Sequence, residues 1–348
     1  MSKTTTLSDI ARAMGVAPST VQRALNGMPG VSEEKRQEIY ETARKMGYHR
    51  NAMATMLKSP NRTIAVVLPE PAFYTEELWK GVRQCFSEHV GFGFHVCEYY
   101  YTRTPDKLAD ALEAVYAEQG THLSGVITMG EMEPRARAVY QKWNAARIPI
   151  VFTGTDSVPQ DRLSCSRGYD EMAGQLAAEL LMFSDHSKNP LRILITGDFS
   201  ISDQYYNMQA FEHLIMQDAV RCKIIKYSDR TGNSAVRDTI CSYLKKDPDI
   251  NVVYSTSATN TVAMCEAISQ SGLSRHPLLI GNDLFRESRQ YLQSGILDVL
   301  IHKRPDRQAY IATQTLINYI VHGLHPEETQ LCCPIIVMKS NASFAGQI

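Results

Sequence analysis

From Ile64 onward, short apolar runs rich in Val and Ile alternate with longer segments that have the pattern of amphipathic helices. Strands that are apolar along their whole length and alternate with helices are typical of parallel sheets in α/β folds. Because ten strands approach the limit for one open sheet, we expect two smaller, doubly wound sheets. The strands are predicted at 64–69, 94–100, 124–129, 148–154, 192–197, 223–228, 251–256, 278–283, 297–302 and 334–339, and the helices between them at 76–89, 105–119, 133–146, 169–184, 203–217, 233–246, 259–272, 286–294 and 305–322.

The segment before these strands has a different pattern, and we expect residues 1–48 to be entirely helical. Ser8 can cap a first helix that Gly15 ends, Pro18 suits the first turn of a second helix, and Ser32 can cap a third. Residues 1–60 contain nine Lys and Arg against five Asp and Glu, whereas the whole chain has a net charge of -1. A basic head on an acidic body favours contact with nucleic acid, although an ordinary surface hairpin of helices could carry the same excess.

The first 60 residues contain "T-L-x-D-I-A", "A-x-G-V", "S-T-V-x-R-A-L-N", "V-S-x-x-x-R", "A-x-x-x-G-Y" and "N-x-x-A-x-x-L", in this order. With these motifs the segment resembles the helix-turn-helix headpiece of the LacI/GalR family of bacterial transcriptional regulators. The remainder resembles that family's sugar-binding core in its order of strands and helices. The resemblance implies a small all-α DNA-binding domain followed by two α/β subdomains of periplasmic-binding-protein type I.

The resemblance also implies which headpiece residues contact DNA. The second helix of such a motif enters the major groove, where Arg can bind guanine and Gln can bind adenine through two hydrogen bonds. Contacts to phosphates fix the register without reading the sequence. The matching base-reading residues are Pro18, Ser19, Gln22 and Arg23, and those near phosphates are Thr6, Leu7, Asn26 and Ser32. As a departure from the family, Ala17 stands where a Ser is usual, which removes a helix cap.

Residues 49–61 correspond to the hinge of the family, which becomes helical on the operator. There a Leu inserts into the minor groove, where an apolar wedge unstacks a base step. Leu57 and Ala54 match this hinge pattern, and Arg50 replaces a usual Pro. The alternative is a plain linker in which the Leu has no special role.

The core is expected to bind a small effector outside the carboxyl ends of its strands, in the cleft between the subdomains. Asp283 matches a ligand-binding acid of the family, although it could instead cap the next helix. An Arg that usually reaches the effector is replaced by Asn207. The candidate effector residues are Phe73, Tyr74, Asp156, Asp203, Gln204, Asn207 and Asp283. Lys303 and Arg304 would favour an anionic effector if either pointed into the cleft, but we expect them to face solvent.

Together these features predict a headpiece at 1–48, a hinge at 49–61 and an effector-binding core at 62–340. In the core, the first subdomain is expected at 62–158 plus 285–322 and the second at 159–284 plus 323–340. The expected function is a homodimeric, cytoplasmic repressor that binds palindromic double-stranded operator DNA under the control of a sugar, sugar phosphate or polyol. The alternative is an α/β sugar-binding protein or enzyme that does not act on DNA.

The sequence favours the regulator over that alternative. The common motifs of nucleotide-binding and hydrolytic enzymes are absent, and the ten His have no metal-ligand spacing. We therefore expect no enzymatic activity, no cofactor and no metal. The eight Cys include no C-x-x-C and are expected to be reduced. No apolar run is long enough to span a membrane, and the N-terminus resembles no secretory signal.

Overall fold

Three short helices form the N-terminal unit of the computed structural model: α1 (Leu7–Met14), α2 (Pro18–Leu25) and α3 (Glu33–Lys45). The structure describes residues 5–25, 30–46, 48, 62–102, 104, 106–184, 190–218, 222–229, 233–272 and 275–345. The predicted cap at Ser8 is wrong, because Thr6 caps α1 and exchanges hydrogen bonds with Asp9. The predicted roles of Gly15, which ends α1 with a φ of 64°, and of Ser32, whose hydroxyl accepts the N–H of Lys35, are confirmed.

The chain then forms a six-stranded parallel sheet with the strand order β11-β5-β4-β3-β1-β2. Helices α6 and α7 cover one face of this sheet, and α5 and α13 cover the other. The strands are β1 (Arg62–Pro69), β2 (Phe94–Tyr101), β3 (Leu123–Gly130), β4 (Ile150–Asp156), β5 (Ser164–Gly168) and β11 (Thr329–Cys332); the helices are α5 (Tyr74–Glu88), α6 (Lys107–Gln119), α7 (Pro134–Ala145) and α13 (Pro305–His322).

A second six-stranded sheet has the order β12-β10-β9-β8-β6-β7, in which only β12 is antiparallel to its neighbour. Helices α8 and α9 cover one face, and α10, α11 and α12 cover the other. The strands are β6 (Leu191–Gly197), β7 (Cys222–Ser228), β8 (Val252–Ser255), β9 (Leu278–Asn282), β10 (Val299–His302) and β12 (Ile335–Met338); the helices are α8 (Asp170–Ser184), α9 (Ser202–Asp218), α10 (Asn233–Lys246), α11 (Ala258–Ser271) and α12 (Arg286–Ser294).

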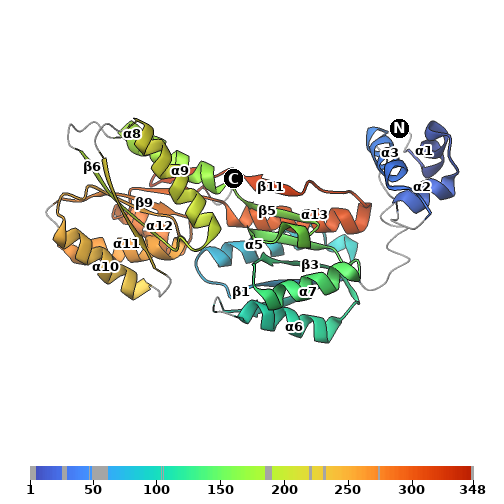
Figure 1. Cartoon of the computed structure of the whole chain (residues 1–348), viewed down its shortest axis with the longest axis horizontal. Helices are drawn as coiled ribbons and strands as arrows, with labels where there is room; N and C mark the ends of the chain where they lie inside the picture. The colour runs from blue at the N-terminus through green and yellow to red at the C-terminus, as the bar shows by residue number, and fades with distance from the viewer. Residues whose placement is uncertain are drawn as a thin grey trace.

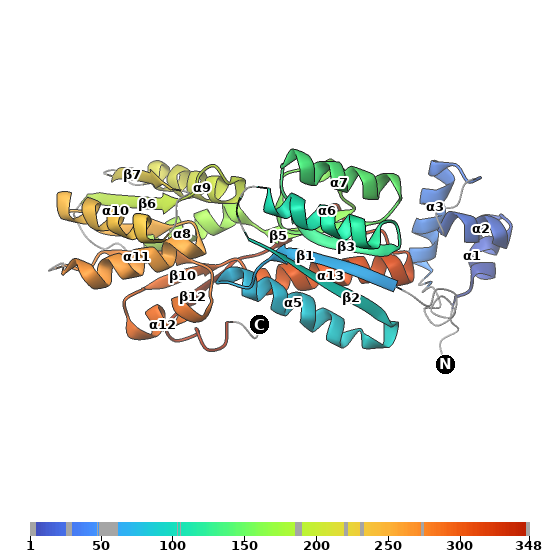
Figure 2. The same ribbon diagram turned by 90° about the horizontal axis from the view of Figure 1, so that it is seen from below.

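The two α/β units lie side by side, and the three N-terminal helices lie beyond the first unit (Figure 1, Figure 2). The ring of Tyr40 in α3 meets the ring of His325, which follows α13, edge-on at 4.7 Å. No helix in the described part of the chain has both the length and the apolar character needed to cross a membrane.

The predicted alternation of strands and helices and the two sheets are confirmed, but two strands and the division of the chain differ from the prediction. The short strands β5 and β11 carry few large apolar residues and were not predicted. Both join the first sheet, although 159–284 and 323–340 were assigned to the second subdomain. Conversely, α12 and β10 belong to the second unit, although 285–322 was assigned to the first. An apolar run predicts that a strand is buried, but it does not say which sheet the strand joins.

Three connections join the units, after β5, after β10 and after β11. Helix α13, which follows the second connection, packs closely on α5 because Gly81 has no side chain. A Cβ at this position would overlap the carbonyl of Asp306 and lie 2.9 Å from the backbone nitrogen of Tyr310.

Candidate functional site

The second helix of the N-terminal unit presents one polar face to solvent. Val21 and Ala24 on α2 are fully buried against Ile10 of α1 and Ile39 of α3. The predicted base-reading residues, Pro18, Ser19, Gln22 and Arg23, are all exposed. A helix supported from behind with its polar face exposed has the geometry needed to enter a groove of DNA.

Of the residues predicted near phosphates, two already serve as helix caps, Thr6 for α1 and Ser32 for α3. Thr6 is exposed, and its hydroxyl donates to Asp9 at 2.6 Å. Ser32 is exposed at the start of α3, and Leu7 is half-buried against the core of the N-terminal unit. Asn26 and the hinge residues Arg50, Ala54 and Leu57 lie outside the described residues.

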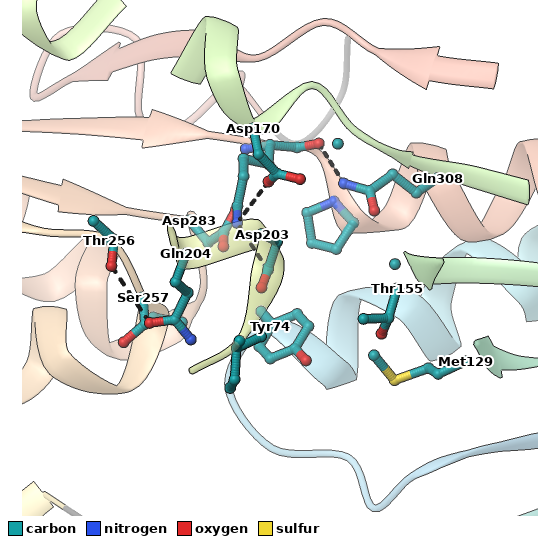
Figure 3. Close-up of a pocket in the computed structure, with 16 residues that line it drawn as sticks. Tyr74, Met129, Thr155, Asp170, Asp203, Gln204, Thr256, Ser257, Asp283 and Gln308 are labelled. Carbon is teal, nitrogen blue, oxygen red and sulfur yellow. Dashed lines mark hydrogen bonds and ion pairs between the residues drawn. The ribbon is translucent and has the colours of Figure 1, made fainter. Parts of the chain in front are cut away.

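A pocket lies between the two α/β units, at the carboxyl ends of their strands, and holds about 590 Å³ of unfilled space including its open mouth. Figure 3 shows side chains from both units and from the connections between them converging on it. The first unit contributes Tyr74, Met129, Gly154 and Thr155; the second contributes Ile201, Asp203, Gln204, Thr256, Ser257, Ala258 and Asp283; Gly168, Asp170, Lys303, Pro305 and Gln308 lie at or next to the connections.

Four of the seven predicted effector residues line this pocket: Tyr74, Asp203, Gln204 and Asp283. The side-chain carbonyl of Gln204 accepts the backbone N–H of Asp198 at 2.8 Å, so its amide NH₂ group is oriented as a donor. Asp283 is 4% exposed, and its carboxylate accepts the backbone N–H of Lys303 at 3.0 Å. Burial opposes its ionisation, but the neighbouring His302 and the charge of Lys303 outweigh burial and hold the pKa of Asp283 below its usual value.

The other three predicted effector residues lie outside the pocket lining, each for its own reason. The ring of Phe73 packs edge-on against Phe285 at 5.4 Å. Asp156 accepts two hydrogen bonds from the nearly buried Arg162, at 2.8 and 2.6 Å. Asn207 is fully buried, and its side chain bonds to Tyr254 and Asn282.

Lys303 is the pocket residue whose orientation was predicted wrongly. Its side chain does not face solvent but lines the pocket, with the residue only 8% exposed. Its ammonium nitrogen lies 3.3 Å from a carboxylate oxygen of Asp170 and 3.6 Å from one of Asp203. Gly168 leaves room for it, because a Cβ at that position would lie 3.3 Å from the Cβ of Lys303. Gln308 holds the backbone of Lys303 by donating to its carbonyl at 2.7 Å.

Burial and neighbouring charges shift the pKa values of Asp170 and Lys303 in opposite directions. Asp170 begins α8 and is 3% exposed, and its burial raises its pKa to about 7 although Lys303 and Arg167 are close. Burial alone would lower the pKa of Lys303, but the charges of Asp170, Asp203 and Asp283 outweigh it and raise that pKa. Lys303 therefore stays charged at every physiological pH. Strongly shifted pKa values in a cleft are typical of functional sites.

Residues with a strained, left-handed backbone conformation are concentrated at the pocket. Five residues other than glycine have positive φ values within the described part of the chain, and three of them are in the lining or next to it. They are Phe73 (φ 49°) before Tyr74, Asp283 (φ 64°), and Arg304 (φ 58°) after Lys303. Such conformations persist only where the surrounding structure holds them, and they are frequent at ligand-binding sites.

Comparison with known proteins matches both parts of the chain. Residues 6–51 match the model of bacterial regulatory proteins of the lacI family, and residues 64–323 match that of the periplasmic binding protein domain. Catabolite control protein A of Streptococcus mutans is 28% identical over 185 residues, which cover 52% of this chain and 53% of that protein. Catabolite control protein A of Staphylococcus epidermidis is 23% identical over 69% of each chain. The matched region thus spans about half to two thirds of these relatives.

Solved structures of binding proteins share the fold. A glucose-galactose binding protein from Geobacillus stearothermophilus is 22% identical with a TM-score of 0.69, and the match covers 81% of this chain and 99% of that one. An ABC transporter solute binding protein from Agrobacterium vitis, bound with alpha-D-tagatopyranose, is 14% identical with a TM-score of 0.72 over 82% and 97% of the two chains. At these identities the likeness shows the fold of the core.

Proposed function

Since the chain belongs to the periplasmic binding protein domain family and carries a lacI-family regulatory domain before that core, we propose that it is a ligand-controlled transcriptional repressor. The exposed face of α2 carries this proposal. Pro18, Ser19, Gln22 and Arg23 face outward from a helix whose other side is fully buried. In this proposal the chain acts as a binding protein in the bacterial cytoplasm and catalyses no reaction.

In the proposed complex, α2 lies in the major groove and Arg23 binds a guanine through two hydrogen bonds. Thr6, Leu7, Asn26 and Ser32 contact phosphates on either side and fix the register. Two copies related by a two-fold axis bind the two halves of a palindromic operator. The hinge at 49–61 orders between them, and Leu57 inserts into the minor groove beside Ala54 and Arg50.

The pocket is the proposed effector site, and a sugar or polyol is the proposed ligand. It combines an aromatic ring, Tyr74, which can pack on the apolar face of a sugar, with the polar groups of Gln204 and Asp283, which can bind its hydroxyls. Because both units and two of their connections line the pocket, a ligand that favours one arrangement of the units changes how the paired headpieces are spaced. Such coupling is typically about 1–3 kcal/mol and reciprocal.

Selection of operators from random double-stranded DNA with the full chain tests this proposal. We expect palindromic sequences to be enriched, and an Arg23→Ala variant to bind them more weakly and with relaxed specificity at one base pair, while an Arg286→Ala variant binds as wild type does. Arg286 is a matched control because it is exposed on α12, far along the chain from the headpiece. Enrichment of no sequence would contradict the proposal and favour a sugar-binding protein that does not act on DNA.

A band shift with the selected operator tests the hinge separately. Leu57→Ala is expected to weaken operator binding, because the apolar wedge that opens the base step is lost. A variant that bound as tightly as wild type would show that Leu57 belongs to a plain linker.

A further inference from the structure

Asp203 stands out among the charged groups of the pocket because its charge is only partly balanced. It lies in the first turn of α9, and its side chain is 28% exposed. One carboxylate oxygen lies 3.6 Å from the ammonium of Lys303, which is beyond the usual length of a hydrogen bond. The other oxygen, Oδ1, is buried and has no hydrogen-bond partner among the described residues. A buried acceptor without a donor is unfavourable and indicates a missing partner.

The charges around the pocket show why no side chain satisfies Asp203. The lining contains three carboxylates, Asp170, Asp203 and Asp283, and Lys303 is its one cation within the described residues. Arg167 adds a second positive charge, but it reaches only Asp170, at 3.3 Å. Both cations lie nearest to Asp170, at 3.3 Å each, so Asp203 has a weaker charge partner than Asp170.

This balance argues against an anionic effector. Lys303 points into the cleft, but its ammonium already lies between Asp170 and Asp203 and is almost inaccessible. A phosphate or carboxylate would have to separate Lys303 from these partners and then lie beside their negative charges. Desolvating a charge without pairing it is strongly unfavourable.

Other lining groups suit ligand hydroxyls, which can both donate and accept hydrogen bonds. The hydroxyl oxygen of Thr155 is buried and has no hydrogen-bond partner among the described residues. Gln204 offers its amide NH₂ group, and Tyr74 offers an aromatic ring that can bind a cation or an apolar sugar face.

We propose that the effector is a hydroxylated amine, such as an amino sugar, whose protonated amino group binds Asp203 while its hydroxyls meet Gln204, Thr155 and Asp283. The ammonium supplies both the donor that Oδ1 lacks and a positive charge beside Asp203, which Lys303 pairs only at 3.6 Å. This inference rests on the proposed effector site and narrows its ligand from sugars in general to those bearing one positive charge.

Titration calorimetry of the full chain at pH 7 tests the inference with matched ligands. Glucose, galactose and mannose are each compared with their 2-amino, 2-acetamido and 6-phosphate derivatives. Charge-assisted hydrogen bonds are stronger than neutral ones, so an amino sugar should bind at least about tenfold more tightly than its parent and its acetylated form. The phosphates should not bind. Equal or tighter binding of a neutral or phosphorylated sugar, or binding of none of the amines, would overturn the inference.

An Asp203→Asn variant tests whether Asp203 is the group that binds the ammonium of the ligand. The substitution should weaken binding of the amino sugar but leave binding of its neutral parent nearly unchanged, so the roughly tenfold preference for the amine should disappear. The reason is that the amide cannot form the charge-assisted hydrogen bond. Asp110→Asn, at an exposed ion pair on α6, is the matched control and should keep the preference. A preference that survives in Asp203→Asn places the ammonium elsewhere and overturns the assignment, provided that its unfolding curve matches wild type. Operator binding is measured separately without ligand, so failure of the regulator proposal is distinguished from failure of the ligand assignment.

Discussion

Replacing Lys303 with Met removes the cation that lies between Asp170 and Asp203 while keeping most of the side-chain volume. Met keeps the apolar stem that packs beside Gly168, so the change acts mainly on charge. Asp170 is 3% exposed, and in the variant Arg167 is its one remaining cationic neighbour among the described residues, while the negative charge of Asp203 stays close. A buried carboxylate that loses a cation can avoid the full electrostatic penalty by taking up a proton.

The magnitude follows from the pKa of Asp170, which burial raises from 3.8 to about 7 in the wild type. A carboxyl group whose pKa is higher in the folded than in the unfolded state contributes stability that is fully present when the pH is below the unfolded-state pKa. For Asp170 this contribution is on the order of 4 kcal/mol, and it is lost as the pH rises to about 7. Above pH 7, Asp170 of the wild type is ionised in both the folded and the unfolded state. In Lys303→Met its pKa is higher still, so only the folded state keeps the proton. The variant then loses a further 1.4 kcal/mol or so per pH unit.

Urea unfolding at pH 5.5, 7 and 8.5 measures this effect. The stability difference between wild type and Lys303→Met should be about the same at pH 5.5 and 7, and larger by about 2 kcal/mol at pH 8.5. Because the pKa of Lys303 is raised, its own charge does not change over this range. Lys107→Met removes an exposed ion pair on α6 and should change stability by less than about 1 kcal/mol at each pH. If the Lys303→Met and wild-type curves stay parallel up to pH 8.5, Lys303 does not control the ionisation of Asp170.

Three further substitutions test other parts of the structure. Arg23→Ala should weaken operator binding by about 1–3 kcal/mol and relax specificity at one base pair, measured by fluorescence anisotropy on a set of substituted operators; an equal loss at every position would indicate a phosphate contact instead. Gly81→Ala should lower the free energy of unfolding by about 1–3 kcal/mol, because its Cβ would overlap the backbone of α13, whereas Gly91→Ala, in open space, should change it little; equal effects would refute the close packing of the two helices. Arg162→Met should destabilise the chain by about 3–5 kcal/mol in urea unfolding, because Asp156 is left buried and unpaired, and adding Asp156→Asn should restore most of the loss; a double variant no better than the single one would contradict this.

The fold was predictable wherever burial leaves a strong pattern in the sequence. Strands covered by helices on both faces are mostly apolar, so the centres of β1, β3 and β6 stand out as short runs rich in Val, Ile and Leu. Strand β5, with the sequence "SCSRG", is also mostly buried, but Ser, Cys and Gly give no apolar run. Its position depends on pairing with β4 and β11, and that pairing is a property of the assembled sheet. Two of the three errors in the domain boundaries follow from this strand and from its partner β11; the third is the assignment of α12 and β10 to the first unit.

The pocket was predictable only to the extent that the topology of parallel sheets determines it. Asp283, at the end of β9, had to lie where the carboxyl ends of the strands meet, whatever its neighbours. The topology of the sheets does not determine whether the side chain of Lys303 points into the pocket or into solvent. It depends on the left-handed backbone at Arg304, which turns the chain from β10 into α13, and on a carboxylate that comes 133 positions earlier in the sequence. A Lys beside an Arg, just before a helix, has the sequence pattern of a solvated surface charge. Only the assembled connection shows that Lys303 is buried among acids, where its charge is already paired and does not favour an anionic ligand.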